Sequence, residues 1–425
     1  MTAFILIAVI TLSALLGMPL FAVILAAACA GFYLTGIDLS AIAIEIYRLT
    51  DTPVMSALPL FTVAGYFLAE SNTSKRLVRL SSAFLGWMPG GLAVVSFVTC
   101  AVFTAFTGAS GVTIVAVGAL LFPALTRARY SEKFSLGLVT TSGSLGLLLP
   151  PSLPLILYGI VAQQMGSNVE IEDLFLAGIL PAILMIVLLS VWSVWATRDR
   201  VVHLEPFSGK EAWVAVKAAA WEIPLPLFLV AGIYGGYFAV SEAAAVVALY
   251  VFIVEVFIYR EVPLARVPAV IRDAMVMVGG ILLILGVSLA FTNFLVDAEV
   301  PTRLFTLIQS KIAGKLTFLI LLNLILLALG AILDIFSAIV IMVPLLLPIA
   351  QSYGIDPVHL GIIFLANMQI GYFTPPVGMN LFIASYRFER PVTEIYASAV
   401  PFMFVMLLAL LIITYVPALS LIFLS

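Results

Sequence analysis

The sequence predicts an all-α polytopic membrane protein, because of its composition, its recurrent apolar runs and its lack of alternating strands. Of the 425 residues, 64% are hydrophobic and 10% are charged, whereas soluble domains are nearer half apolar and one quarter charged. Apolar runs close to the ~20 residues that a helix needs to cross a bilayer recur along the whole chain. The roughly ten-residue alternating strands of a membrane β-barrel are not evident. Because lipid cannot hydrogen-bond the backbone, only a closed β-barrel or a bundle of α-helices can span a membrane. Without barrel strands, the sequence predicts the bundle of α-helices.

Clusters of charged residues separate the apolar runs and mark the ends of the expected helices. We expect about ten to twelve hydrophobic helices, several of them too short or too interrupted to cross the bilayer cleanly. The first run, from Phe4 to Tyr33, has no basic leader, and we expect it to form the first transmembrane helix. The longest polar connector covers 197–220 and divides the chain into two halves.

The composition also argues against several classes of function. The net charge of −3 carries little information, but no basic tract suggests a nucleic-acid partner, and membrane lipid is the expected surroundings. Cys29 and Cys100 lie in apolar runs without metal-ligand spacing, so no transition-metal site is predicted. The sequence contains no P-loop, HExxH or Ser-His-Asp arrangement, and we therefore predict neither an ATPase nor another enzyme.

The order of the runs predicts five consecutive regions. These are an N-terminal helix with scaffold, a first repeat, central scaffold helices, a second repeat and a C-terminal transmembrane helix. Each repeat combines a re-entrant helical hairpin with a proline-broken helix. The regions are 1–57; 58–165, with a hairpin at about 97–125 and a broken helix at about 134–163; 166–281; 282–390, with a hairpin at about 317–350 and a broken helix at about 358–387; and 391–425.

The two repeats are recognised by residues that recur at a nearly constant offset in the numbering. Three features recur at an offset of 225 (375 − 150), and an Arg-Leu pair recurs at 227 (303 − 76). Weak internal duplication of this kind is frequent in membrane carriers, and an odd number of crossings between the copies makes them inverted. The matching residues are Pro123 and Pro348, Gly146 and Gly371, the pairs Pro150–Pro151 and Pro375–Pro376, and the pairs Arg76–Leu77 and Arg303–Leu304.

The proline pairs interrupt apolar runs, and an interruption at membrane depth exposes backbone groups. Proline removes a donor and clashes with the preceding turn, and lipid tolerates free backbone groups only where protein or a polar cavity satisfies them. Free carbonyls suit a hard cation such as Na⁺, and the N–H end of the following helix suits a carboxylate. A structural kink whose free groups are bonded by neighbouring side chains is the alternative. The polar residues around the two breaks are Thr140, Thr141, Ser142, Ser144, Ser152, Asn367, Gln369, Thr374 and Asn380.

A small polar tip is expected in each hairpin ahead of the break. Gly108, Ser110, Gly111 and Thr113 stand midway through the first apolar stretch, and Gly330, Asp334 and Ser337 stand in the second. Asp334 has no other charge near it in the sequence, and an ionisable residue at membrane depth marks a functional path by default. A neutral or hydroxyl-bonded structural carboxyl is the alternative for Asp334.

These motifs together resemble the large membrane subunit of the tripartite ATP-independent periplasmic (TRAP) transporters. The likeness runs essentially from end to end, with both hairpins and both breaks in the family's order. The resemblance implies an elevator-type ion-transporter fold with a scaffold and a mobile transport region. The stretches that carry it are "LPLFTVAGYFLAES", "SGSLGLLLPPSLPLILYG", "LGAILDIFSAIVIMVPLLLPIA" and "GYFTPPVGMNLFIAS".

The resemblance also implies a function and partners. It implies Na⁺-coupled import of a small organic acid anion, such as a C4-dicarboxylate or sialic acid, across the bacterial inner membrane. A small four-helix membrane (Q) subunit would bind the chain, and a periplasmic substrate-binding (P) protein would deliver substrate. The coupling ion Na⁺ is the expected cofactor, with no organic cofactor. A stand-alone Na⁺/carboxylate symporter of the same fold is the first alternative, and a channel or non-transporting scaffold is the second.

The family's sites can be carried over to matching positions of this sequence. Substrate would lie between the two hairpin tips, with a Na⁺ site at each tip. Thr113 stands where the family often has an aspartate, which puts an acidic residue at the first tip in doubt. The predicted sodium-binding residues are Ser110, Gly111, Ser142, Gly143, Ser144, Pro150, Asp334, Gly371, Thr374 and Pro375, and the predicted substrate-binding residues are Thr113, Ser152, Ser337, Asn367, Gln369 and Asn380.

Overall fold

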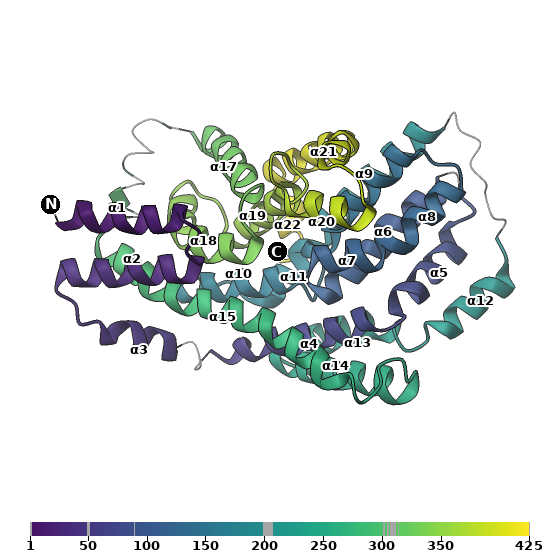
Figure 1. Cartoon of the computed structure of the whole chain (residues 1–425), viewed down its shortest axis with the longest axis horizontal. Coiled ribbons are helices and arrows are strands. Elements are labelled where there is room, and N and C mark those ends of the chain that lie inside the picture. The colour runs from purple at the N-terminus through teal and green to yellow at the C-terminus, as the bar shows by residue number, and fades with distance from the viewer. Residues whose placement is uncertain are drawn as a thin grey trace.

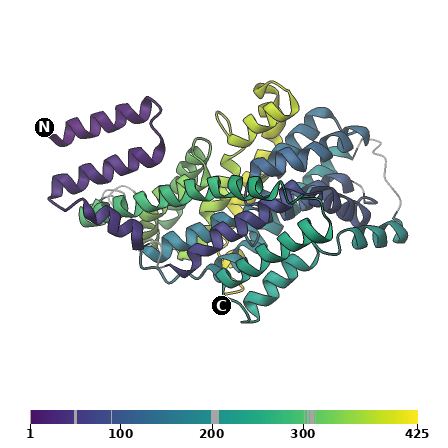
Figure 2. The same cartoon turned by 60° about the horizontal axis from the view of Figure 1, so that its bottom comes forward.

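A computed structural model describes residues 2–48, 52–88, 90–198, 207–300 and 314–424, together with residues 302, 303, 306 and 312. In this part of the chain the regular structure is all helical, as the composition predicts. Figure 1 shows an elongated bundle, with α1 (Thr2–Leu15), α2 (Leu20–Thr35) and α3 (Ser40–Arg48) at one end. The prediction of a single first helix from Phe4 to Tyr33 is wrong, because Gly17, with φ of +89°, and Pro19 separate α1 from α2. Figure 2 shows that α1 and α2, drawn in purple, project from the body of the molecule.

Several of the described helices are long and apolar enough to cross a membrane. Five helices meet this test singly, and up to eight spans result if each of three bent helix pairs is one span. The chain is therefore a multi-pass membrane protein. The five spans are α11 (Ile171–Thr197), α14 with the π-helix η4 (Val240–Ile258), α15 (Val267–Asp297), α18 (Ile335–Ser352) and α21 (Val392–Tyr415).

The first repeat contains a hairpin followed by a broken helix, as predicted. The two helices that precede the hairpin, Val54–Glu70 and Thr73–Leu85, meet at an angle of 75°. The two halves of the broken helix meet at an angle of 42°. Gly108, with φ of +65°, ends the first arm of the hairpin in a left-handed conformation that favours glycine. The elements are α4 (Ala57–Glu70), α5 (Thr73–Leu85), α6 (Gly91–Thr107), α7 (Ser110–Ala116), α8 (Gly118–Arg127), α9 (Glu132–Ser142), the 3₁₀ helix η3 (Leu145–Leu148) and α10 (Leu153–Gln164).

The second repeat contains the same parts in the same order. Its hairpin is formed by α17 (Lys315–Gly330) and α18, and its broken helix by α19 (Pro357–Gly371) and α20 (Met379–Phe388). The second arm of each hairpin begins at equivalent positions of the duplication, Ser110 in the first repeat and Ile335 in the second. Leu304, which belongs to the Arg-Leu match, lies outside the described residues.

The two repeats interlock. The first arm of each hairpin packs on the broken helix of its own repeat, α6 on η3 at the break and α17 on α19 ahead of the break. The second arm packs on the broken helix of the other repeat, α7 on α20 and α18 on α10. Each hairpin therefore packs on elements of both repeats.

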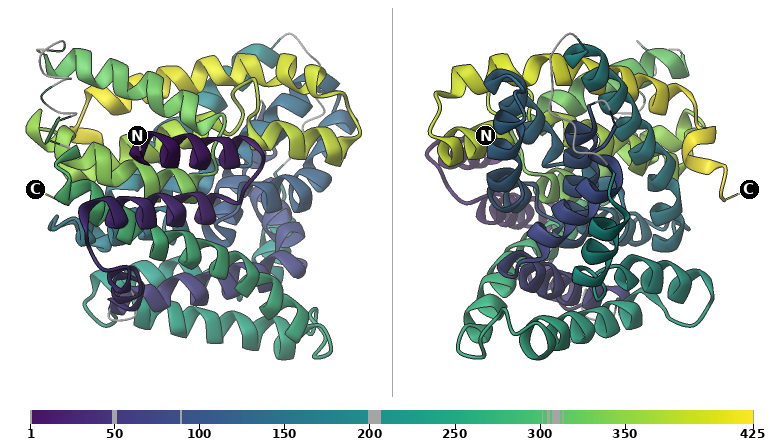
Figure 3. Two further views of the ribbon diagram at one scale, coloured as in Figure 1. Left: turned by 60° about the vertical axis from the view of Figure 1, so that its left-hand side comes forward. Right: turned by 90° about the vertical axis from the view of Figure 1, so that its right-hand side faces the viewer.

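The remaining helices form the surroundings of the repeats. Helix α4 packs on α14 and α15, and α2 packs on α15. Figure 3 shows α4 and the segment 224–297 as one layer, with α17 to α21 on the opposite side of the molecule. Helix α11 contacts α6, α10, α19 and α21 and so lies between elements of both repeats. The other described helices are the 3₁₀ helix η2 (Pro53–Ser56), α12 (Gly209–Ala218), α13 (Pro224–Tyr234) and α22 (Ala418–Leu421).

Candidate functional site at the hairpin tips

In each repeat, one glycine lets the backbone at the break approach the first arm of the hairpin. A Cβ atom on Gly371 would lie 2.4 Å from the carbonyl carbon of Gly330, and one on Gly146 would lie 2.5 Å from the amide nitrogen of Ala105. Gly146 and Gly371 are partners in the internal duplication, and so are Ala105 and Gly330. Both repeats therefore use the same backbone-to-backbone contact, which a side chain would prevent.

The first tip carries a cluster of buried oxygen atoms. The Oγ1 atoms of Thr104 and Thr113 lie 2.7 Å apart, and Thr104 Oγ1 donates a 2.8 Å hydrogen bond to the carbonyl oxygen of Gly143. A Cβ atom on Gly143 would lie 3.2 Å from the carbonyl oxygen of Ser110, so the break runs directly under the tip. Both threonine residues are fully buried. The cluster brings together predicted residues from the hairpin and the first break.

Thr104 was not predicted from the sequence. It stands in the apolar run "AVFTAFT", where a threonine reads as a helix residue bonded to its own backbone. Its position four residues before Gly108, on the arm that faces the break, is the signal that could have found it.

The three serines of the first break bond locally or to the other repeat. Ser142 Oγ donates to the carbonyl oxygen of Val139 and lies 3.3 Å from the sulfur of Cys100. Ser152 Oγ donates to the carbonyl oxygen of Leu147 inside the break. Ser144 Oγ donates a 3.1 Å hydrogen bond to the carbonyl oxygen of Gln369. These hydroxyls donate hydrogen bonds to backbone carbonyls, as expected for a structural kink whose free groups are bonded by neighbouring side chains.

Asp334 caps helix α18 at the second tip. Its Oδ1 atom accepts 3.0 Å hydrogen bonds from the amides of Phe336 and Ser337, and its Oδ2 atom accepts from the hydroxyl of Ser337. A carboxylate at a helix N-terminus is stabilised by the free N–H groups and by the helix dipole. The structure thus shows the hydroxyl-bonded carboxyl that was the alternative for Asp334, and cation binding by this residue stays a prediction.

The second break closes onto the second tip through backbone groups and one tyrosine. The amide of Gly378 donates to the carbonyl oxygen of Ala331, and the amide of Ile335 donates to the hydroxyl of Tyr372, at 2.9 and 2.8 Å. Thr374 Oγ1 donates to the carbonyl oxygen of Ile370 in the preceding turn. Tyr372 was missed because an aromatic residue in an apolar run reads as packing. In each break, the peptide bond between the two adjacent prolines is cis.

The predicted substrate-binding residues do not all converge on one place. Asn380 accepts a 2.8 Å hydrogen bond from Ser110 Oγ and so joins the first tip to the second broken helix. Asn367 donates to Asn323 on α17, whereas Gln369 donates to the sulfur of Met185 on α11. Asn367 and Gln369 therefore face different helices, although both are fully buried.

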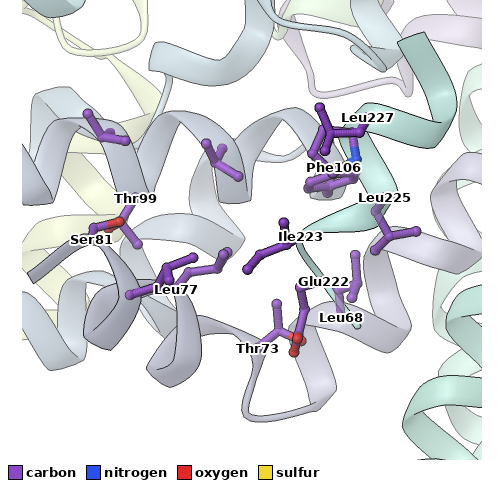
Figure 4. Close-up of a pocket in the computed structure, with 14 residues that line it drawn as sticks. Leu68, Thr73, Leu77, Ser81, Thr99, Phe106, Glu222, Ile223, Leu225 and Leu227 are labelled. Carbon is purple, nitrogen blue, oxygen red and sulfur yellow. The ribbon is translucent and has the colours of Figure 1, made fainter. Parts of the chain in front are cut away.

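An apolar cavity of about 350 Å³ lies between α4, α5, α6 and the start of α13. Figure 4 shows Glu222 and Thr73 at one edge of it, with leucine side chains along the wall. Glu222 belongs to a buried charge cluster in which Arg76 also pairs with Glu255 and Glu261. None of the predicted site residues is among the described residues that line this cavity.

With the geometry in place, the chain can be compared with known proteins. The family model described as "Tripartite ATP-independent periplasmic transporter, DctM component" matches residues 4–419. The chain belongs to this family. The resemblance to the TRAP large membrane subunit is thereby confirmed, and the DctM family is a family of transporter permeases rather than of enzymes.

Relatives of this DctM-family chain cover most of its length. It is 33% identical to the C4-dicarboxylate TRAP transporter large permease protein DctM of Rhodobacter capsulatus, over 92% of this chain and 91% of that protein. It is 36% identical to the protein of the same name from Vibrio cholerae, over 86% and 84%. It is 30% identical to the ectoine TRAP transporter large permease protein TeaC of Halomonas elongata, over 96% and 95%.

A solved structure has the same fold as this DctM-family chain. The YdaH transporter of Alcanivorax borkumensis aligns with a TM-score of 0.61 over 88% of this chain and 86% of that one. At 16% identity the similarity concerns the fold alone. It agrees with the all-helical architecture with broken helix pairs described above.

Proposed function

We propose that the chain is the translocating subunit of a TRAP transporter that imports a small organic anion across the bacterial inner membrane, coupled to Na⁺. The names of relatives that are 30% to 36% identical support the substrate class. They are named for C4-dicarboxylates, isethionate and ectoine, all small polar solutes. The observation that carries the proposal is the buried oxygen cluster of Thr104, Thr113 and Gly143 at the first tip.

The chemistry of this cluster suits a monovalent cation. Hard cations prefer oxygen ligands, and Thr104 Oγ1 lies 2.7 Å from Thr113 Oγ1 and 2.8 Å from the carbonyl oxygen of Gly143. The cluster carries no carboxylate, because Thr113 stands where the family often has an aspartate. A neutral oxygen set of this kind favours a single positive charge and gives up its internal hydrogen bonds when a cation enters.

Cation binding at the tip supplies a means of coupling. The cluster joins α6 and α7 of the hairpin to the first break, so a bound Na⁺ would hold these three elements together. A ligand shifts a conformational equilibrium by its difference in affinity for the two states. Na⁺ would therefore favour the closed tip, and substrate bound between closed tips would move with the mobile repeats as in an elevator.

Two partners belong to the same proposal. TRAP large permeases work with a small membrane subunit and a periplasmic binding protein. One relative, the isethionate TRAP transporter permease protein DctMQ of Oleidesulfovibrio alaskensis, is 35% identical over 87% of this chain, which spans 58% of that longer protein. A length difference of this kind is expected where a small membrane subunit is fused to the large one.

The test is uptake of labelled solute into proteoliposomes that contain the chain with its small membrane subunit. Succinate, isethionate and ectoine would be offered with a Na⁺ or a K⁺ gradient, with and without the candidate binding proteins. We expect uptake of one solute that requires both Na⁺ and a binding protein. Equal uptake with K⁺ would remove the Na⁺ coupling, uptake without a binding protein would indicate a stand-alone symporter, and gradient-independent flux would indicate a channel.

A further inference from the structure

A continuous hydrogen-bonded bridge connects the two hairpin tips. The hydroxyl of Ser110 at the first tip donates a hydrogen bond to the side-chain oxygen of Asn380. The backbone amide of Asn380 donates a 2.9 Å hydrogen bond to the backbone carbonyl oxygen of Tyr372. The hydroxyl of Tyr372 in turn accepts from the amide of Ile335 at the second tip, at 2.8 Å. Asn380 is fully buried and Tyr372 is 3% exposed, so water does not compete for these bonds.

The internal duplication shows that the fold does not require polar groups at these positions. The equivalents of Asn380 and Tyr372 in the first repeat are Leu155 and Leu147. Both leucines are buried, and α10, which carries Leu155, packs on hairpin arm α18 as α20 packs on α7. Apolar side chains therefore suffice for the equivalent packing. A buried asparagine is unfavourable unless it is bonded, and here its side chain is bonded to a tip.

We propose that Asn380 and Tyr372 couple the two hairpin tips, so that closing one tip favours closing the other. Both residues act as positioning residues that transmit the state of one tip to the other through the segment 372–380. The inference rests on the proposed function, because it makes cation binding at the two tips cooperative. It goes beyond that function by naming the contact through which the sites communicate.

The physical reason for the coupling is the cost of a partly broken bridge. When the first tip opens, the side chain of Asn380 loses the hydrogen bond that Ser110 donates to it. When the second tip opens, the hydroxyl of Tyr372 loses the hydrogen bond from the amide of Ile335. Each opening leaves a buried acceptor unpaired on the segment 372–380 and loosens the hold of that segment on the other tip. Two tips that share one bridge therefore open together more readily than singly.

The test is a double-mutant cycle on the accessibility of the first tip. Ala109 lies at this tip and is half-buried, so Ala109→Cys in a Cys29→Ser/Cys100→Ala background reports tip opening by the alkylation rate of the introduced thiol. The perturbation is Asp334→Ala, which removes the cap of α18 at the second tip. We expect Asp334→Ala to raise this alkylation rate about fivefold or more.

The second mutation of the cycle removes the bridge. Asn380→Leu introduces the side chain that the chain itself has at position 155, and it should reduce the effect of Asp334→Ala on the alkylation rate to less than about twofold. Tyr372→Phe, which removes the bridge at its other end, should do the same and serves if Asn380→Leu does not fold. Tyr158→Phe is the matched control, because it removes a partly buried hydrogen bond between α10 and Pro357, far from the tips in sequence, and should leave the effect unchanged.

The outcomes separate this inference from the proposed function. The cycle is measured without Na⁺, so it decides the coupling whether or not the ion is used. An effect of Asp334→Ala that survives both bridge variants, or no effect of Asp334→Ala at all, overturns the coupling. Protection of the introduced thiol is then titrated with Na⁺, with a Hill coefficient of about 2 expected for the parent and of about 1 for Asn380→Leu. A complete lack of Na⁺ protection would overturn the proposed function alone.

Discussion

Ser144 Oγ donates a 3.1 Å hydrogen bond to the carbonyl oxygen of Gln369, the residue that the internal duplication pairs with Ser144. Ser144 lies between α9 and η3, and Gln369 lies near the end of α19, so each residue stands close to the break of its own repeat. The contact therefore places the two breaks against each other at the centre of the duplicated unit, where η3 of one repeat packs on α19 of the other. Carriers with internal repeats bind their solutes at this interface.

The bond between Ser144 and Gln369 is expected to stabilise the interface. Ser144→Ala leaves a buried carbonyl without this donor, and we expect it to lower the free energy of unfolding by about 1–3 kcal/mol. Thermal unfolding of the purified protein in detergent measures the change. Ser135→Ala is the control, because its hydroxyl donates to the carbonyl of Ser131 in its own helix. A loss as large for Ser135→Ala as for Ser144→Ala would contradict the prediction.

Gly371→Ala is expected to separate the second break from its hairpin. The added Cβ atom would lie 2.4 Å from the backbone of Gly330, so one of the two segments has to move. We expect a loss of stability of about 3 kcal/mol or more and a loss of uptake. Gly279→Ala on α15 meets nothing within 4 Å and should keep or slightly raise the melting temperature. Equal behaviour of the two variants would show that the close contact is not needed.

Arg76 is expected to matter far more for stability than its neighbour Arg79. Arg76→Ala leaves the carboxylates of Glu222 and Glu255 buried without their cation, a change that costs about 3–5 kcal/mol. Arg79 pairs with Glu211 at 2.7 Å, but both side chains are about half exposed, so water and salt screen this pair and Arg79→Ala should leave the melting temperature nearly unchanged. The melting temperatures of the two variants test this, and similar losses would argue against a buried cluster.

The pair between Arg76 and Glu261 predicts a dependence of stability on pH. Burial would raise the pKa of Glu261, but hydrogen bonds from the amide of Asn72 and from Arg76 outweigh it and hold this pKa below the ordinary value of 4.5. A carboxyl whose pKa is lower in the folded state contributes its full stability above the unfolded pKa and loses it as pH falls through the folded value. We expect the difference in melting temperature between the parent and Glu261→Gln to be constant above pH 4.5 and to shrink below it. A difference that grows on acidification would contradict this assignment.

Thr104→Val is expected to weaken Na⁺ coupling without disturbing the helix. Valine keeps the shape of threonine but removes an oxygen from the cluster with Thr113 and Gly143, and we expect the Na⁺ concentration for half-maximal uptake to rise about tenfold. Thr107→Val is the control, because its hydroxyl donates to the carbonyl of Phe103 in the same helix. An unchanged Na⁺ dependence in Thr104→Val would remove the oxygen cluster from the proposed site.

Much of the architecture follows from local properties of the sequence. Proline pairs at 150 and 375 interrupt helices wherever they stand in a fold, because they lack the amide donor and clash with the preceding turn. The two breaks, the two hairpins before them and the membrane class could therefore be predicted. The constant offset between the proline pairs also predicted which residues of the two repeats are equivalent.

The partners of individual side chains could not be predicted in the same way. Asp334 was singled out for its charge, yet its carboxylate caps α18. Asn367 and Gln369 stand two residues apart, yet they bond to α17 and α11. On a helix such residues point in directions about 200° apart, and the helix that each one meets depends on how the bundle packs.

The sequence by itself determined that the chain is a membrane-embedded duplication with two interrupted helices, because hydrophobicity and proline act within a few residues of where they occur. Only the tertiary structure decided that Ser110 meets Asn380 and that Thr104 joins the first tip. Those contacts arise because the second arm of each hairpin packs on the other repeat. The rotation and crossing of helices that lie far apart in the chain depend on side-chain packing over the whole bundle, which no local pattern encodes.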